Sequence, residues 1–461
     1  MKPRSLGPWA LAIVVIAIAA MRFVIVATLP DADLDSYGHF AAARALVAAP
    51  RELAVHWVWL PGWHFVLALF VELRAGFLGA RLFNAAIAAL GPLVLYHSLA
   101  PRSRRAASIA ALAWALAPLT NVVATSAQSE TLFAVLLVCG CGAIARRRGI
   151  QGGLLGGACL TLACLLRYEG WAVLAGLAVV FLSRDKARTD PDRRRAAALA
   201  VVIGLVTVVV WCVLRAHADG RWFAFVDETR SFVGGLEGGR GPASLLRYTL
   251  VVPVKVFGPA WLIALVGFRR AAREAPELAR ASLGILTFLT MTCLLGGSLG
   301  LERHFASLVP FTCVAIGFGV ERFSLRVARA GVASLAAMLA VHVVVFISTT
   351  RSRWVLERAA AAWIEAHPPG PDTPVVCTDL ALELLVRLPD HRFARELPST
   401  GPALIVGWES RLGDLAHEGT LAKRWNQGGP AGAIVVRVVD ADRARARPRA
   451  STPSNTMSGM N

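Results

Sequence analysis

Three aspartates at alternate positions, Asp31, Asp33 and Asp35, follow directly after the first long apolar run, residues 9–28. They lie where the chain would leave a membrane. A sequence with 30 acidic residues among 461 does not need three of them there for solubility. Carboxylates held near a low-dielectric boundary can bind a metal, act as a general base or stabilise a developing cation. The stretch therefore predicts the catalytic loop of an integral membrane enzyme, with the rest of the chain as its scaffold.

A simpler interpretation is that the three aspartates cap and solvate a helix that begins at Ser36. Aspartate before a helical stretch is ordinary N-cap behaviour, because its side chain accepts a hydrogen bond from a free backbone N–H group. This interpretation accounts for one aspartate and leaves two more, together with Tyr37, without a role. The catalytic interpretation is therefore favoured for the set.

The composition indicates a membrane protein. Hydrophobic residues make up 56% of the chain and charged residues 17%, where a soluble protein carries about 25% charged residues. The net charge of +18 comes mostly from short loops between apolar runs, so the positive-inside bias explains it and no nucleic-acid partner is expected. Of the eight cysteines, Cys377 alone lies outside an apolar run, which argues against a disulfide framework.

The apolar runs predict an all-α multi-pass membrane protein with about eleven transmembrane helices. Lysine and arginine concentrate in alternate loops, whereas the intervening short loops carry Arg167 and Arg303. This alternation predicts a cytoplasmic N-terminus and, with an odd number of spans, a C-terminus on the side of the aspartate loop. The first run lacks a small-residue cleavage site and is expected to be retained. The expected spans are residues 9–28, 77–99, 106–122, 129–145, 151–166, 170–183, 196–214, 250–268, 281–299, 304–321 and 330–349.

Three parts are expected along the chain. Residues 1–350 form the transmembrane domain, in which two long outer loops, 30–76 and 215–249, carry most of the candidate chemistry. Residues 351–440 read as a small extracytoplasmic α/β domain with no nucleophile or glycine-rich turn of its own, and residues 441–461 as a disordered tail. The expected elements of the small domain are helices over 354–366 and 379–388 and strands over 374–378, 403–407 and 433–439.

The first outer loop also contains the aromatic stretch from His56 to His64, which includes Trp59. It is richer in tryptophan than membrane anchoring requires, and it could form a re-entrant or surface-lying helix with an aromatic face for a lipid or a sugar. His39, His56 and His64 could join Asp33 and Asp35 around a divalent ion such as Mg²⁺ or Mn²⁺. Their spacing matches no recognised ligand signature, however, so histidines satisfied by backbone or lipid are expected and no metal site is assigned.

Taken together, these motifs resemble the membrane glycosyltransferases of the GT-C fold, such as protein O-mannosyltransferases and the aminoarabinose transferases of lipid A. That group carries an Asp-x-Asp or Asp-Glu motif after its first span, which both Asp31-Ala-Asp33 and Asp33-Leu-Asp35 fit. No strict Asp-Glu pair exists here, which leaves open which aspartate is the base. Over residues 9–350 the order of the motifs carries the resemblance. The other matching stretches are Trp59–His64, similar to a proline-containing entry to the second span, Ser126–Glu130, Arg167–Gly170 and Arg303-His-Phe with Pro310.

The resemblance implies an inverting transfer of a sugar, a mannose-like hexose, from a polyprenyl-phosphate donor to a hydroxyl on a lipid, glycan or protein. A carboxylate would accept the acceptor's proton. The leaving lipid phosphate calls for nearby cations, and the planar fork of arginine suits phosphate oxygens. The implied catalytic residues are Asp33, Asp35 and Asp31; the phosphate-binding residues are Arg303, His304 and Arg167, followed by Arg221 and Arg247; the substrate-binding residues are Tyr37, His56, Trp59, His64, Glu130 and Glu169.

Each charged candidate has a structural alternative. Arg167 could simply pair with Glu169, and Arg303 with Glu302. Glu130 could cap the helix that it begins, since an acidic side chain suits a helix N-terminus. High alanine, arginine and glycine usage favours a GC-rich bacterium, hence a bacterial inner membrane.

Two other classes of function compete with the enzyme. A transporter or flippase of a lipid-linked saccharide would place charges at mid-span on discontinuous helices, often in two related halves. Here the charges cluster in outer loops and no internal repeat is seen, which favours the enzyme. A non-catalytic receptor or assembly subunit would tolerate loss of the aspartates, whereas an enzyme would not.

Overall fold

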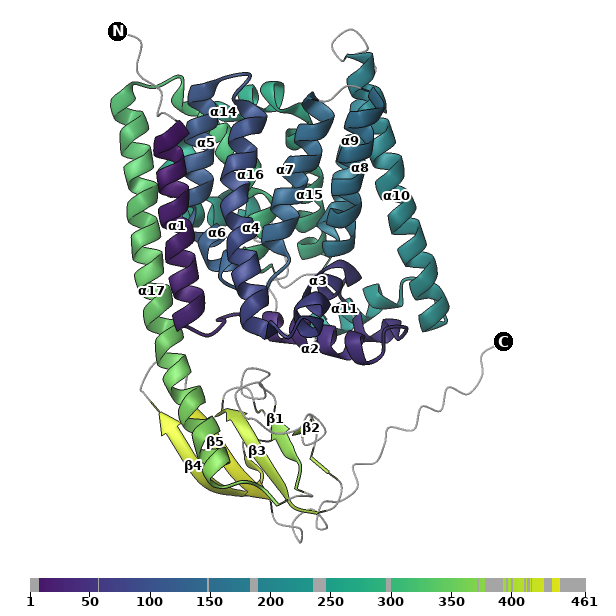
Figure 1. Ribbon diagram of the computed structural model, residues 1–461, viewed down its shortest axis with the longest axis vertical. Helices are drawn as coiled ribbons and strands as arrows, with labels where there is room; N and C mark the ends of the chain where they lie inside the picture. Colours follow the sequence, from purple (N-terminus) through teal and green to yellow (C-terminus); the bar gives the residue numbers. More distant parts are fainter. Residues whose placement is uncertain are drawn as a thin grey trace. The chain divides into compact units, whose positions relative to one another are not determined.

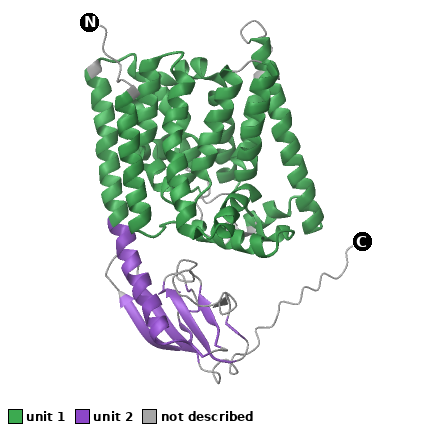
Figure 2. Cartoon of the chain, viewed as in Figure 1, with its two compact units in different colours: residues 1–347 green, residues 348–461 purple. Residues whose placement is uncertain are grey.

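The protein divides into two compact units, residues 1–347 and 348–461, which are coloured separately in Figure 2. The boundary expected from the sequence, after residue 350, lies three residues from this division. In the computed structural model, the described residues are 8–56, 58–146, 149–182, 190–234, 246–295, 300–370, 373–377, 393–394, 397–398, 401–409, 412, 415, 417–426 and 433–439.

The first unit is a bundle of helices (Figure 1). Apolar residues fill its centre, and many more face outward, as expected where the surroundings are lipid. Its described helices are α1 (Pro8–Thr28), α2 (Leu34–Ala48), η1 (Leu53–His56), α3 (Pro61–Glu72), α4 (Gly76–Leu99), α5 (Arg104–Leu116), α6 (Pro118–Ala124), α7 (Glu130–Arg146), α8 (Gly149–Leu166), α9 (Glu169–Leu182), α10 (Pro191–Asp219), α11 (Ala224–Gly234), η2 (Arg247–Val251), α13 (Val252–Phe257), α14 (Ala260–Glu274), α15 (Pro276–Leu294), η3 (Glu302–Ser307), α16 (Val309–Val320) and the first part of α17 (Leu325–Ala366).

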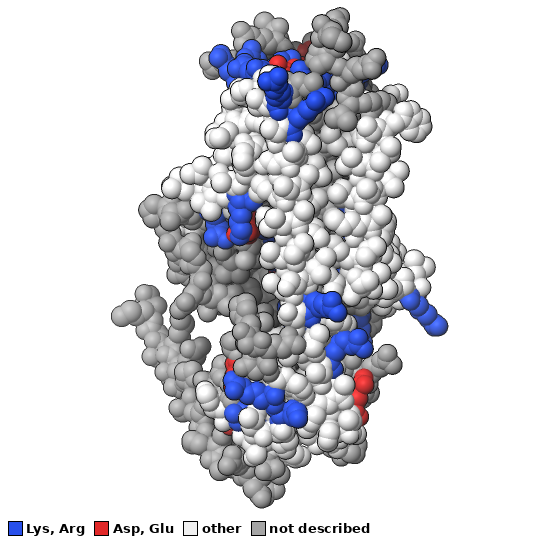
Figure 3. All heavy atoms as spheres, turned by 90° about the vertical axis from the view of Figure 1, so that its left-hand side faces the viewer, with Lys and Arg blue, Asp and Glu red and all other residues white. Residues whose placement is uncertain are grey.

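Apolar helices place this unit in a membrane. Each of the eleven expected spans coincides with a helix or a broken pair of helices. By length and hydropathy, six described helices are able to cross a bilayer, or seven if the bent pair α5 and α6 counts as one span. The count of eleven therefore stays a prediction. On the face shown in Figure 3, lysine and arginine gather at one end of this unit, and the surface below them is mostly uncharged apart from a small group of basic and acidic atoms.

Proline and glycine explain why some expected spans are broken. The α5–α6 pair bends by 57° at Ala117, because Pro118 begins α6 and cannot continue the hydrogen bonding of α5. The segment expected over 250–268 is divided at Gly258, whose φ of 52° ends α13 before Pro259. Such interruptions shorten individual helices without removing the segment from the bundle.

Small residues set the closest helix contacts. A Cβ atom at Gly153 or Gly157 of α8 would lie 2.8 Å from the side chain of Leu199 or Ile203 of α10. Between α14 and α16, a Cβ at Gly267 would collide with the carbonyl oxygen of Ala315. Glycine is required at these positions because close approach of two helices leaves no room for a side chain.

Three helices that were not expected as spans, α2, α3 and α11, gather at one end of the bundle (Figure 1). Helix α2 begins at Leu34, two residues before the expected start, and Asp33 is its N-cap. The aromatic stretch that was compared with the entry to a second span instead leads into α3, which has 12 residues and begins at Pro61. Helices α2 and α3 belong to the first outer loop and α11 to the second, and all three lead to the site described below.

The second unit is a five-stranded mixed sheet. In the order β2-β1-β3-β5-β4, β1 is parallel to β2 and β3, and the other pairs are antiparallel. Apolar residues at the end of α17, including Leu356 and Ile364, pack with Val375 and Leu404 into a core. The described strands are β1 (Val375–Cys377), β2 (Phe393–Ala394), β3 (Ala403–Trp408), β4 (Thr420–Asn426) and β5 (Ala433–Val439).

The expected strands correspond to β1, β3 and β5, whereas β2 and β4 were missed. Strand β2 has two residues, and β4 is an edge strand whose polar sequence, Thr420–Asn426, lacks a buried apolar run. The expected last span and the helix over 354–366 form one continuous helix, α17, of 42 residues. The helix expected over 379–388 and the tail over 441–461 lie outside the described residues.

Candidate active site

Asp31 holds the first outer loop in place. Its carboxylate is buried, accepts hydrogen bonds from the backbone N–H groups of Ala127 at 2.8 Å and Asp33 at 3.0 Å, and lies 3.7 Å from Nε of Arg81. Arg81 in turn donates to the carbonyl oxygen of Leu29 at 2.7 Å. With its lone pairs used in this way, Asp31 faces the α6–α7 connection, and it does not line the cavity of the site.

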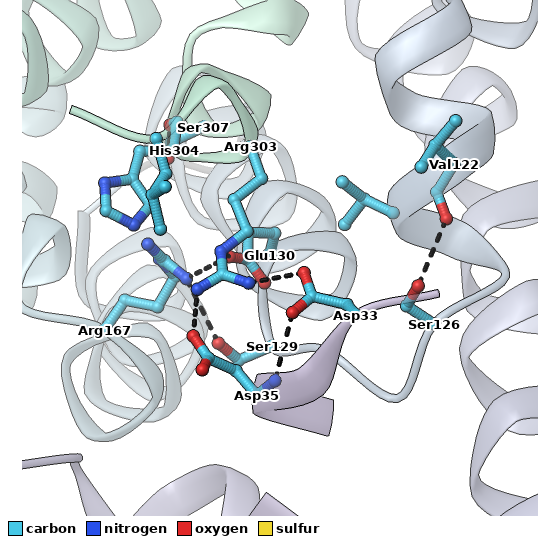
Figure 4. Close-up of polar contacts among 12 residues, drawn as sticks. Asp33, Asp35, Val122, Ser126, Ser129, Glu130, Arg167, Arg303, His304 and Ser307 are labelled. Atoms are coloured by element: carbon cyan, nitrogen blue, oxygen red, sulfur yellow. Dashed lines mark hydrogen bonds and ion pairs between the residues drawn. The ribbon is translucent and has the colours of Figure 1, made fainter. Parts of the chain in front are cut away.

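Asp33 and Asp35 both bind Arg303, which comes from η3, 270 positions after Asp33 in the sequence (Figure 4). The cap geometry orients this pair, since Asp33 accepts from the backbone N–H of Asp35 at 3.1 Å and so begins α2. Arg303 is largely buried, which alone would lower its pKa, but Asp33 and Asp35 raise the pKa overall. The guanidinium of Arg303 therefore stays charged. The two carboxylates beside it, Asp33 and Asp35, come from a different part of the chain than η3.

A second arginine extends this ionic network. Arg167 lies 2.7 Å from a carboxylate oxygen of Glu130 and 2.7 Å from one of Glu169, and it donates to Oγ of Ser129 at 3.4 Å. Glu130 also lies 3.7 Å from Nε of Arg303, so it joins the two arginines. Four carboxylates against two guanidinium groups give the network a formal charge of 2 × (+1) + 4 × (−1) = −2.

The network borders a cavity of about 220 Å³. Asp35, Arg167, Arg303 and His304 contribute polar groups to it, and Glu130 and Glu169 lie beside them. Aromatic and apolar side chains complete the wall, among them Trp59, Tyr168, Leu166, Phe288, Leu289 and Leu301. The cavity therefore has one charged side and one apolar side, as a site for an amphiphilic ligand requires.

Three histidines form a buried chain, of which His39 lines the cavity and the other two lie behind it. Nδ1 of His39 lies 3.0 Å from Nε2 of His64, and Nδ1 of His64 lies 2.8 Å from Nδ1 of His56. The expectation that backbone or lipid would satisfy these histidines is wrong: they bind one another. Burial lowers the pKa of His39 to about 3, assisted by Arg303 and Arg167, and that of His56 to about 4, assisted by Arg215. All three rings are therefore neutral at pH 7.

The histidine chain is not arranged as a metal centre. His64 uses different ring nitrogens for its two neighbours, so the three rings do not converge on one point. Among the described residues, no group of three or more His, Cys, Asp or Glu side chains is placed to hold a metal ion. Between Asp33 and Asp35, the positive charge that a divalent ion would supply comes from Arg303.

The structure thus sorts the predicted site residues into two sets. Asp33 contacts Arg303 at the edge of the cavity, whereas Tyr37 donates to the carbonyl of Asp31 and stacks on Phe77. The predicted residues that line the cavity are Asp35, Trp59, Glu130, Arg167, Glu169, Arg303 and His304; those that lie behind it are Asp31, Tyr37, His56 and His64.

The structural alternatives have mixed outcomes. Arg167 does pair with Glu169, but Glu130 joins that pair. Glu302 pairs with Lys255 at 2.6 Å, so it leaves Arg303 to the aspartates. In the second outer loop, Arg221 pairs with Asp227 on the exposed surface.

Sequence reasoning missed several cavity residues and the anchor of the loop. Gln128, Ser129 and Thr229 line the cavity, and Arg81 locks Asp31. Ser129 adjoins a motif that was recognised, but Thr229 reaches the cavity from α11, about 100 residues away from Ser129 in the sequence. No local pattern in the sequence marks Arg81 as a partner of Asp31, because the two belong to different helices and loops.

Comparisons with known proteins agree with this architecture. Residues 60–214 match the family model described as dolichyl-phosphate-mannose-protein mannosyltransferase. The fold is similar to that of ArnT from Cupriavidus metallidurans bound to undecaprenyl phosphate, with a TM-score of 0.65, 17% identity, and coverage of 93% of this chain and 98% of that one. The apo form of the same protein gives a TM-score of 0.64 with the same identity and coverage.

A weaker likeness links the chain to the apo oligosaccharyltransferase of Archaeoglobus fulgidus, with a TM-score of 0.47, 12% identity, and coverage of 84% of this chain and 64% of that one. No curated protein sequence matches the chain. The agreement of the family model with the ArnT fold confirms the resemblance that the sequence motifs indicated.

Proposed function

The chain has the GT-C fold of membrane glycosyltransferases, and on that premise we propose the reaction. It transfers a sugar, a mannose-like hexose, from a polyprenyl-phosphate donor to a hydroxyl acceptor on the extracytoplasmic side, with inversion. The single observation that supports this most is the cavity in which Arg303 meets Asp33 and Asp35. It brings a phosphate-binding cation next to a potential general base.

The proposed donor site uses both arginines. Donor phosphate oxygens bind Arg303 and Arg167 in the fork geometry that guanidinium groups offer. Binding of the phosphate draws Arg303 away from the aspartates, which frees a carboxylate for the acceptor. The apolar wall of the cavity, from Leu166 and Leu289, receives the first part of the lipid tail. Undecaprenyl phosphate bound to ArnT supports a donor of this chemistry.

The proposed base is Asp35. It lines the cavity and its side chain is 41% exposed, whereas Asp33 is the N-cap of α2 and is 26% exposed. The acceptor oxygen forms a bond to the anomeric carbon from the face opposite the phosphate, while the bond from that carbon to the phosphate oxygen breaks. The proton of the acceptor hydroxyl goes to Asp35, and the electron pair stays on the lipid phosphate, whose charge Arg303 and Arg167 stabilise.

A requirement for Mg²⁺ or Mn²⁺ is a separate proposal for the same pair of carboxylates. Once a donor phosphate holds Arg303, the remaining carboxylates of the network outnumber the cations near them. A divalent ion between Asp33 and Asp35 would then balance their charge. Removal of metal with EDTA tests this directly.

The test is sugar transfer by the purified protein in detergent. The protein receives a panel of radiolabelled polyprenyl-phosphate sugars and a membrane extract as acceptor, with and without EDTA. Transfer from one donor, abolished in Asp35→Asn and retained in Asp227→Asn, would support the enzyme and name the sugar. Asp227 is a suitable control because it is an exposed carboxylate paired with Arg221. Absence of transfer from every donor, in a folded protein, would favour a transporter or a receptor.

A further inference from the structure

A second and larger cavity comes near the candidate active site at one end and extends away from it at the other. It is an apolar groove of about 660 Å³ between α14, α15 and α16, with Phe268, Leu286 and Phe311 in its wall. Among the described residues, none lines both this groove and the active-site cavity. At its rim Leu265 and Leu283 are 50% and 63% exposed, so the groove opens on the outer surface of the helical unit.

Positively charged side chains lie at one end of this groove. Arg269 and Arg280 are the charged residues in its lining. Within the described part of the chain, neither guanidinium has an acidic partner, whereas nearby Arg270 pairs with Glu321 at 2.8 Å. An unpaired arginine beside an apolar surface in a membrane favours a phosphate, which fits its planar fork and neutralises its charge.

This end is remote from the active site. Helix α16 begins two residues after η3, which holds Arg303, and it runs for 12 residues to Val320, next to the Glu321 that binds Arg270. At 1.5 Å per residue, the two ends of α16 are about 18 Å apart. Arg269 is the neighbour of Arg270 in α14, so the charged end of the groove belongs to the opposite face of the helical unit.

We propose that this groove binds an anionic glycerophospholipid, with its phosphate on Arg269 and Arg280 and one acyl chain on the aromatic wall. Two features favour this lipid over the tail of the sugar donor. In the proposed function the phosphate of the donor binds Arg303, about the length of α16 away. The end of the groove near the active site is lined by uncharged residues such as Tyr248 and Phe305. Basic pockets between transmembrane helices recognise anionic head groups in this way.

The test is lipid retention, which does not depend on sugar transfer. The full-length protein is purified in mild detergent, delipidated, offered phosphatidylglycerol or phosphatidylcholine, and analysed by native mass spectrometry. Wild type should retain one phosphatidylglycerol in preference to phosphatidylcholine. Arg269→Ala with Arg280→Ala should weaken that binding about thirtyfold, since each basic residue near a lipid phosphate contributes about fivefold to the affinity.

The matched control is Arg326→Ala with Arg329→Ala, which removes the same charge from exposed positions on α17 outside the groove. It should bind phosphatidylglycerol as wild type does. A second variant, Ala279→Phe, keeps both arginines and narrows the groove, because Ala279 lines it. It should also lose the lipid, and it keeps the test decisive if the arginine variant does not fold.

Three results would overturn the proposal. Equal loss in both double arginine variants would indicate general attraction between charges. Unchanged retention in the groove variants would place the lipid elsewhere. One-for-one displacement of phosphatidylglycerol by polyprenyl phosphate would assign the groove to the tail of the donor instead.

Discussion

Two groups of polar side chains, the ionic network and the histidine chain, lie side by side at one end of the helical unit. One group is charged and the other is neutral. The ionic network keeps its charges and pairs them, since Arg303 and Arg167 each bind two or more carboxylates, although a net negative charge remains. The histidine chain avoids charge, because each neutral imidazole can offer one donor and one acceptor to its neighbours. The charged network can therefore exchange its ion pairs for contacts with a charged ligand. The neutral histidine chain instead positions the helices that carry it.

The two groups are also coupled. The positive charges of Arg303 and Arg167 add to burial in lowering the pKa of His39. Trp59 lies between them, since it lines the cavity and its ring is 4.3 Å from that of His39, centroid to centroid. The network is therefore the part that should react with substrate, and the histidine chain the part that should fix the wall against which it reacts.

The largest expected effect comes from removing a cation of the network. Arg303→Ala should lower kcat/KM for the lipid donor by about 10²–10³, because a charge aimed at the leaving phosphate contributes that much to the transition state. Arg303→Lys keeps the positive charge but lacks the planar guanidinium group. Its kcat/KM should therefore lie between those of wild type and Arg303→Ala. Arg221→Ala, at an exposed pair, is the control. Unchanged donor kinetics in Arg303→Ala would move the phosphate to Arg167 or to the second outer loop.

The next largest effect is a difference in stability between two aspartate variants, Asp31→Ala and Asp33→Ala. Asp31→Ala leaves Arg81 buried without its carboxylate partner, which costs about 3–5 kcal/mol. Asp33→Ala removes a helix cap and costs about 1 kcal/mol. Thermal unfolding in detergent measures both. Equal losses of stability would show that the two aspartates do not differ in role as their surroundings indicate.

Acid should act on the histidine chain and leave the arginines charged. The unfolded chain protonates its histidines near the ordinary pKa of 6.5, whereas the folded protein holds the pKa of His39 at about 3 and of His56 at about 4. Between these values the unfolded state binds more protons. Stability is therefore complete above about pH 6.5 and falls by about 1.4 kcal/mol per pH unit for each histidine as the pH decreases.

Unfolding measured from pH 7 to pH 5 tests this slope. His56→Gln should reduce it by about one proton, because it removes one buried titrating ring. His217→Gln, which removes an exposed histidine from α10, is the matched control. The interpretation fails if the two variants show the same slope as wild type.

The sequence was sufficient for the features that depend on local pattern. Apolar runs located the helical segments that were expected as spans, but not α11, and the alternate aspartates with Arg303 and Arg167 located most of the cavity. It was not sufficient where a partner comes from a distant segment. Asp31 and Asp33 look equivalent in the chain, and only the positions of Arg81 and Ala127 make one an anchor and the other a ligand of Arg303.

The partners of the three histidines could not be predicted from the sequence either. Their types allowed a metal site, and their spacing did not exclude one, because a sequence does not say which ring nitrogen faces which neighbour. The structure places α2, η1 and α3 so that His64 lies between His39 and His56. Strand β4 was not predicted for a similar reason. Its own sequence is polar, and its pairing with β5 is what makes it a strand.

The smallest expected effect concerns Trp59, where the two groups meet. If the ring supports the sugar from the cavity side, Trp59→Ala should raise the KM for donor or acceptor by about tenfold, as loss of a stacked ring costs about 0.5–1.5 kcal/mol beyond its buried area. Trp59→Phe should keep most of that binding. Trp222→Ala, at a ring that is 60% exposed, is the control. A fall in kcat with unchanged KM would instead mean that Trp59 acts through His39 and His64, holding the wall rather than the sugar.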